Sequence, residues 1–95
     1  MSEDFRIPPH DLVAEQSVLG AVFISPETMT SLADELIPED FYKPANKIVF
    51  KTMLSLFEKG EPIDATTMIS ALTNQGDISN IGGITYVVEL VNSTP

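Results

Sequence analysis

Along most of the chain, apolar residues are spaced as in helices rather than in strands. The longest such pattern runs from Pro44 to Gly60, a proline that suits a first helical turn and a glycine that suits the position after the last one. Its apolar positions follow the i, i+3, i+4, i+7 rule. They are Phe50, Met53, Leu54 and Phe57, with Ile48, Val49 and Leu56 widening the stripe. So broad an apolar face predicts a central, mostly buried helix, with Lys47 and Lys51 on its solvated edge.

Shorter helices are predicted on both sides of this central one. Asp11 is a good N-cap for a helix that places Leu12, Leu19 and Phe23 on one face. The other expected elements are a helix capped by Ser25, a short helical turn begun by Pro38 and a helix from Asp64 to Gly76.

The segment "GGITYVVELVNS" supports two interpretations. Its β-branched residues favour a strand. However, its apolar residues lack strict alternation, and Ile84, Val87, Val88 and Val91 fit one helical face. We therefore predict a helix, which makes the fold an all-α compact bundle of five to six short helices. Helices this short are marginal alone, so their apolar stripes have to pack against one another.

Composition narrows the class of protein. The 95 residues suffice for one domain, and the 43% hydrophobic content is typical of a globular chain. The net charge of -9 argues against direct, tight nucleic-acid binding, which requires several Lys or Arg side chains. No apolar run approaches the roughly 20 residues that span a bilayer, so we expect no membrane segment. The absence of cysteine excludes disulfides and thiolate metal sites and is consistent with a reducing cytosol.

His10 and Glu15 invite a functional interpretation. His10 is the only histidine, and the chain has no cysteine, so we favour a capping or packing contact over a base or metal ligand. Glu15 projects between Leu19 and Val22 in the apolar stripe, where a carboxylate needs hydrogen bonds. We favour a structural tether for the incoming "PPH" segment, and a partner contact remains the alternative. No catalytic, cofactor-binding or metal-binding residue is predicted.

Two features of the last segment also have competing interpretations. Gly82 and Gly83 precede a helix, but no Lys, Ser or Thr follows as a phosphate loop requires, so we expect a tight turn. Tyr86 lies beside the predicted core face. Ordinary packing at the core edge and an interface role are both open for it.

Five segments follow one another in an order that resembles a known family. They are "PPHDLVAEQSVLGAVFIS", "DFYKPANKIVFKTMLSL", "GEPIDATTMISAL", "IGGITYVVEL" and "NSTP". Together they resemble the N-terminal domain of DnaB-type replicative DNA helicases, bacterial or phage, from Ile7 to Pro95. The resemblance implies a flexible tail at 1–7 and a helical head domain at 8–95. The C-terminal hairpin, the linker and the RecA-like ATPase domain of the family would be absent.

The resemblance also implies a function. In the family these heads form the collar of a hexamer, often as a trimer of dimers, and bind the C-terminal domain of primase or a helicase loader. This fragment would therefore be cytoplasmic and without catalysis or cofactor, with ATP and Mg expected for the full-length protein. The alternative is an acidic helical protein–protein interaction module unrelated to replication.

Single positions match the family pattern to different degrees. Val13 stands where the family commonly has a glutamate implicated in primase modulation, which implies an altered contact. Tyr86 matches a tyrosine of the family that is also implicated in primase modulation. Ile84 follows the double glycine, near a head-to-head contact of the family. The resemblance thus implies Val13, Glu15 and Tyr86 as partner-binding residues and Ile84 as a self-association residue.

Overall fold

The computed structural model describes residue 7 and residues 10–93. Within this part of the chain the elements are α1 (Leu12–Ile24), α2 (Thr28–Glu35), η1 (Pro38–Asp40), α3 (Pro44–Glu58), α4 (Ala65–Asn74), η2 (Ser79–Ile81) and α5 (Ile84–Val91). Five α-helices and two 3₁₀ turns, without a strand in the described ranges, confirm the all-α prediction. The ambiguous last segment is helical, as predicted.

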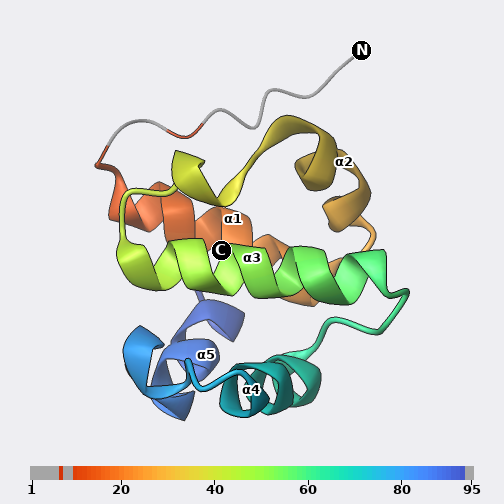
Figure 1. Ribbon diagram of the computed structural model, residues 1–95. Coiled ribbons are helices and arrows are strands. Elements are labelled where there is room, and N and C mark those ends of the chain that lie inside the picture. Colours follow the sequence, from red (N-terminus) through yellow and green to blue (C-terminus); the bar gives the residue numbers. More distant parts are fainter. Residues whose placement is uncertain (1–6, 8–9, 94–95) are drawn as a thin grey trace.

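Helix α3 lies at the centre of the molecule. In Figure 1 it crosses the middle, with α1 behind it, α2 and η1 on one side and α4 and α5 on the other. Val49, Phe50 and Met53 on this helix are fully buried. The central, buried helix is therefore confirmed. Phe57, predicted on the same stripe, is 37% exposed in the last turn of the helix, where Leu56 is the buried residue.

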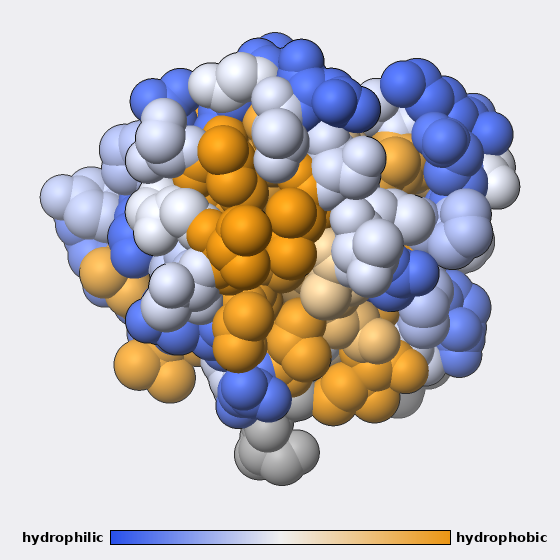
Figure 2. Space-filling view, turned by 90° about the horizontal axis from the view of Figure 1, so that it is seen from below, coloured by the Kyte–Doolittle hydropathy of each residue, from blue (hydrophilic) through white to orange (hydrophobic). Residues whose placement is uncertain are grey.

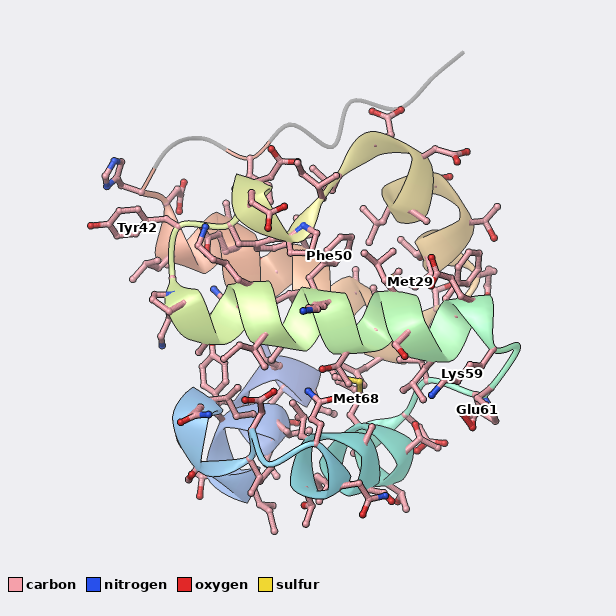
Figure 3. The ribbon with its side chains drawn as sticks, viewed as in Figure 1. Met29, Tyr42, Phe50, Lys59, Glu61 and Met68 are labelled. Atoms are coloured by element: carbon pink, nitrogen blue, oxygen red, sulfur yellow. The ribbon has the colours of Figure 1, made fainter. Side chains whose placement is uncertain are left out.

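One hydrophobic core receives side chains from every α-helix. Phe41, just after η1, packs its ring against Phe50 with the centroids 5.0 Å apart. Figure 3 shows Phe50 on the side of α3 that faces η1, whereas Met68, which belongs to α4, lies on the opposite side of α3. The central helix therefore separates two packed layers, and each of its faces buries apolar surface.

The helix ends follow the predicted signals with one exception. Asp11 Oδ1 accepts from the N–H of Ala14 at 2.9 Å, and Asp64 forms a reciprocal cap with Thr67. Ser25, predicted to cap the second helix, instead ends α1, because its N–H donates to the carbonyl of Ala21. The Ser25 hydroxyl donates to Glu27 Oε1, and this hydrogen bond lowers the pKa of the Glu27 carboxyl. Helix α2 therefore begins only at Thr28.

The predicted N-terminal tail falls largely outside the described residues. Ile7, which the prediction assigned to the tail, packs against the core. Residues 1–6 are not described, so the tail stays a prediction. Among the described helices, none combines the length and the apolar character that crossing a bilayer requires.

Candidate functional site

A buried carboxylate lies where the first turns of α1 and α3 meet. Glu15 is 1% exposed. Its Oε2 accepts from the N–H of Tyr42 at 2.5 Å, and its Oε1 accepts from Asn46 Nδ2 at 2.7 Å and from the N–H of Lys43 at 3.3 Å. These donors surround the start of α3, where the helix dipole favours a negative charge. Glu15 thus holds the backbone that leads into α3 and a side chain in the first turn of that helix.

Asn46 extends this network to α5. It is fully buried on α3, and while its Nδ2 donates to Glu15, its Oδ1 accepts from the hydroxyl of Tyr86. We call Glu15, Asn46 and Tyr86 the polar relay. No buried side-chain nitrogen or oxygen in the described ranges lacks a hydrogen-bond partner. The relay is therefore a fully satisfied network that joins α1, α3 and α5.

Lys43 covers the ring of Tyr86. Its Nζ lies 4.4 Å from the ring centroid, a distance at which an ammonium is attracted to an aromatic face. Tyr86 is only 5% exposed. The backbone of Lys43 is held by Glu15 and its side chain by Tyr86, so this residue contacts both ends of the relay.

Exposed residues lie next to the relay. The Tyr42 ring is 55% exposed, and in Figure 3 it points away from the body of the molecule. The ring of His10 packs on it with the centroids 4.0 Å apart, which agrees with the packing role predicted for this histidine. Val13, on the first turn of α1, is 75% exposed. We call His10, Val13, Tyr42 and Lys43 the docking end.

Of the four predicted site residues, two are buried and two are exposed. The structure joins Glu15 and Tyr86 through Asn46 and buries both, whereas Val13 and Ile84 lie outside the relay and are exposed. Their partner-binding and self-association roles stay predictions. Glu15 is a tether, but the segment it holds is the approach to α3, and no described residue of "PPH" bonds to its carboxylate. Pro8 and Pro9 lie outside the described residues.

Sequence reasoning did not select Asn46. A signal was present, because Asn46 precedes Val49, Phe50 and Met53 at spacings of three, four and seven, on the apolar stripe. A polar residue at such a position needs a buried partner. Its two partners lie 31 and 40 residues away along the chain, so their identity could not be predicted.

Helix α5 presents apolar surface. Ile84 is 54% exposed and Val88, one turn later, 47%. Figure 2 looks onto the side formed by α4 and α5 and shows a band of apolar side chains across it. Exposed apolar patches of this kind often mark surfaces where another protein binds.

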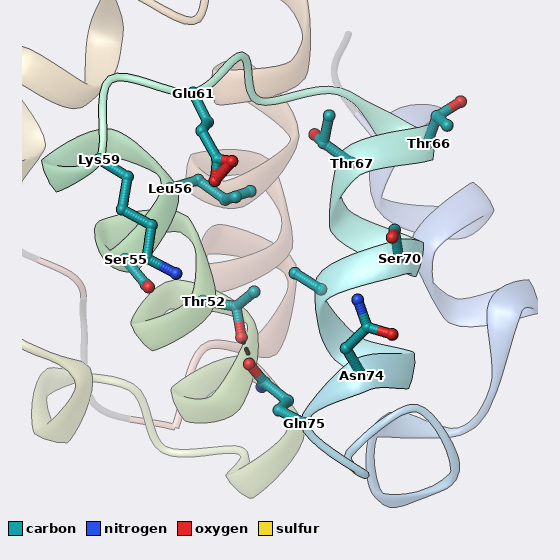
Figure 4. Close-up of a pocket in the computed structure, with 11 residues that line it drawn as sticks. Thr52, Ser55, Leu56, Lys59, Glu61, Thr66, Thr67, Ser70, Asn74 and Gln75 are labelled. Atoms are coloured by element: carbon teal, nitrogen blue, oxygen red, sulfur yellow. Dashed lines mark hydrogen bonds between the residues drawn. The ribbon is translucent and has the colours of Figure 1, made fainter.

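A polar groove of about 520 Å³ lies between α3 and α4. Figure 4 shows hydroxyl and amide side chains along its walls, among them Ser55, Ser70 and Asn74. The buried hydroxyl in its wall, Thr52, donates to the carbonyl of Ile48 and accepts from Gln75 Nε2. The hydrogen bond from Gln75 joins the end of α4 to α3, so we interpret the groove as a satisfied seam between these helices.

In the described part of the chain, four α-helices pack around a buried central one, and the polar relay joins α1, α3 and α5. This arrangement defines a small all-helical domain. The chain belongs to the family of the DnaB-like helicase N-terminal domain, which it matches over residues 7–95. The resemblance seen in the sequence is thereby confirmed.

Curated relatives are replicative helicases. The chain is 43% identical to the replicative DNA helicase DnaB of Geobacillus stearothermophilus over an alignment of 97 residues. That alignment covers 100% of this chain and 21% of the relative. The chain is 41% identical over 90 residues to the replicative DNA helicase DnaC of Bacillus subtilis, covering 95% of this chain and 20% of that protein. The chain therefore spans about a fifth of the length of these relatives.

A solved structure supports the same assignment. The crystal structure of the N-terminal domain of DnaB helicase from Mycobacterium tuberculosis superimposes with a TM-score of 0.87 at 40% identity. The match covers 94% of this chain and 64% of that one. The bundle found here is thus the fold of a DnaB N-terminal domain.

Proposed function

We propose that this chain acts as the N-terminal collar domain of a hexameric replicative DNA helicase. Its role there is to mediate oligomer assembly and to bind primase, a helicase loader or both, in the cytoplasm. The domain itself has no catalysis and no cofactor, and ATP with Mg serves the full-length protein. The observation that carries this proposal is the family match over residues 7–95, shared with relatives that are replicative helicases.

Charge and exposure support a protein partner. The chain has 14 acidic residues against five Lys and Arg, which disfavours contact with a phosphate backbone and favours a partner with basic surface. Near the relay, Val13 and Tyr42 add exposed apolar area, and aromatic residues are enriched at protein interfaces. The chain as a whole thus supplies the acidic charge, and the docking end supplies the exposed apolar area.

Titration with the C-terminal domain of primase tests the function. In ¹⁵N-labelled protein we expect the amide signals of Val13, Glu15, Tyr42 and Tyr86 to shift together as the primase domain is added. The same titration on Val13→Arg, which puts a positive charge at the exposed start of α1 and repels a basic partner surface, should need more primase, whereas Thr66→Arg on the exposed side of α4 should behave as wild type. Unchanged spectra at saturating primase, or shifts confined to α4, would refute the proposal.

Self-association is expected to depend on Ile84. In a two-fold contact each residue is buried twice. Only the exposed 54% of Ile84 can be newly buried in a dimer, so replacing it with aspartate removes roughly 1 kcal/mol of burial per copy. The change also adds a charge, and we expect at least about a tenfold weaker dimer. The measurement is sedimentation velocity across a concentration series. Thr85→Asp adds the same charge at the next, exposed position and should sediment as wild type. An Ile84→Asp profile equal to that of the wild type would show that this surface is wrong.

A further inference from the structure

Tyr86 has no free group to offer a partner. Its side chain is 5% exposed and its hydroxyl is donated to Asn46 Oδ1. The Nζ of Lys43 lies over its ring. The polar group and the ring face of Tyr86 contact Asn46 and Lys43, so a change at Tyr86 can reach the docking end through these two residues.

Asn46 fixes which group donates and which accepts in each hydrogen bond of the relay. An ionised carboxylate can only accept hydrogen bonds, so Glu15 requires the NH₂ end of the amide. The carbonyl end is then left to face Tyr86, whose hydroxyl has to donate. Each hydrogen bond of Asn46 thus orients the other, and a side chain that lacks either end would break the link between α1 and α5.

The relay reaches the surface through Glu15. Its carboxylate binds the N–H groups of Tyr42 and Lys43, and the Tyr42 ring in turn packs on His10. One buried amide is therefore connected, within two contacts, to exposed or half-exposed residues that precede α1 and α3. The relay also spans the first turns of all three helices that meet at this end.

We propose that Asn46 is the positioning residue of the docking end. It holds Tyr42, Lys43 and the start of α1 in the arrangement that a protein partner binds, although it is fully buried and touches no partner itself. The choice of primase as that partner rests on the proposed function. The positioning of Tyr42 and Lys43 does not, because it is a property of the free protein.

The test compares two buried polar residues on the same helix. Asn46→Leu keeps the approximate volume and removes both hydrogen bonds of the relay, whereas Thr52→Val removes a buried hydroxyl that bonds to Gln75 and leaves the relay intact. In the free proteins, Asn46→Leu should shift the amide signals of Tyr42 and Lys43 and the ring signals of His10. Thr52→Val should shift signals near Gln75 and leave those of Tyr42 and Lys43 in place.

Affinity for the primase C-terminal domain is the second readout. At a temperature where denaturation curves show both variants folded, we expect Asn46→Leu to bind about tenfold more weakly than wild type, within the range for mutations that touch no ligand. Thr52→Val should bind as wild type. If Asn46→Leu does not fold, Tyr86→Phe replaces it, because this change removes only the hydroxyl and leaves the ring under Lys43. It should move the same Tyr42 and Lys43 signals and weaken binding in the same direction.

Three results would overturn the inference. One is unchanged Tyr42 and Lys43 signals in Asn46→Leu and Tyr86→Phe. Another is equal loss of affinity in Asn46→Leu and Thr52→Val, which would mean a general effect of stability. The last is wild-type affinity in Asn46→Leu. If the wild-type chain itself binds no primase, the proposed function fails, and the amide signals of the free proteins alone decide the positioning role.

Discussion

Replacing Glu15 with glutamine is expected to lower the free energy of unfolding by about 3 kcal/mol. The amide has the same size, but one of its two ends is a donor, and both carboxylate oxygens of Glu15 accept hydrogen bonds. In either orientation the new NH₂ group faces the N–H of Tyr42 or the NH₂ of Asn46. A donor then opposes a donor in a buried place, and the negative charge at the start of α3 is lost.

Urea denaturation followed by circular dichroism measures this effect. In thermal unfolding the same loss would lower the melting temperature by roughly 12–24 °C for a domain of this size. Glu35→Gln is the matched control, because Glu35 is exposed on α2 and its substitution should change stability by less than about 0.5 kcal/mol. Equal curves for Glu15→Gln and Glu35→Gln would show that the carboxylate is not the tether described here.

The second large effect is expected at Phe50. Phe50→Ala should destabilise the domain by about 4 kcal/mol, because it removes a fully buried ring and leaves a void beside Phe41. Phe57→Ala makes the same chemical change on the same helix, but that ring is 37% exposed, so a cost of about 1 kcal/mol is expected. Comparison of the two urea midpoints separates the loss of core packing from the loss of helix propensity.

The comparison tests the place of α3 in the fold. The free energy of unfolding of domains of this size is about 5–10 kcal/mol, so Phe50→Ala should leave only a small margin of stability. If Phe50→Ala and Phe57→Ala had the same midpoint, Phe50 would not be buried in the core as described. Phe50→Ala is also unsuitable for binding studies, because partial unfolding would imitate a loss of affinity.

The elements that could be predicted are those with strong local signals. The helices from Pro44 and from Asp64 have caps and apolar periodicity that agree, and both formed as expected. Ser25 shows where local signals compete. A serine before a proline is a good N-cap, but Ser25 ends α1, and its hydroxyl donates to Glu27 Oε1 instead of accepting from a backbone N–H of α2. The local sequence does not show which of these two roles Ser25 takes.

The candidate site could be predicted only in part. Glu15 stood out because a carboxylate within an apolar stripe has to be satisfied, and that requirement is local chemistry. Its partners were not predictable, since Tyr42 and Asn46 follow 27 and 31 residues later. The same limit applies to Tyr86, for which the sequence left core packing and an interface role open. Its hydroxyl is bonded 40 residues away, to Asn46.

Periodicity, caps and composition, all present in the linear order of residues, settled that this chain is an acidic bundle of short helices and which faces are apolar. They could do so because helix formation and capping depend on neighbours within about four positions. Folding settled which helices meet, and therefore that Glu15 holds the approach to α3 and that Asn46 links it to Tyr86. Contacts of this kind arise from packing between segments distant in the chain, and no repeat within one segment encodes them.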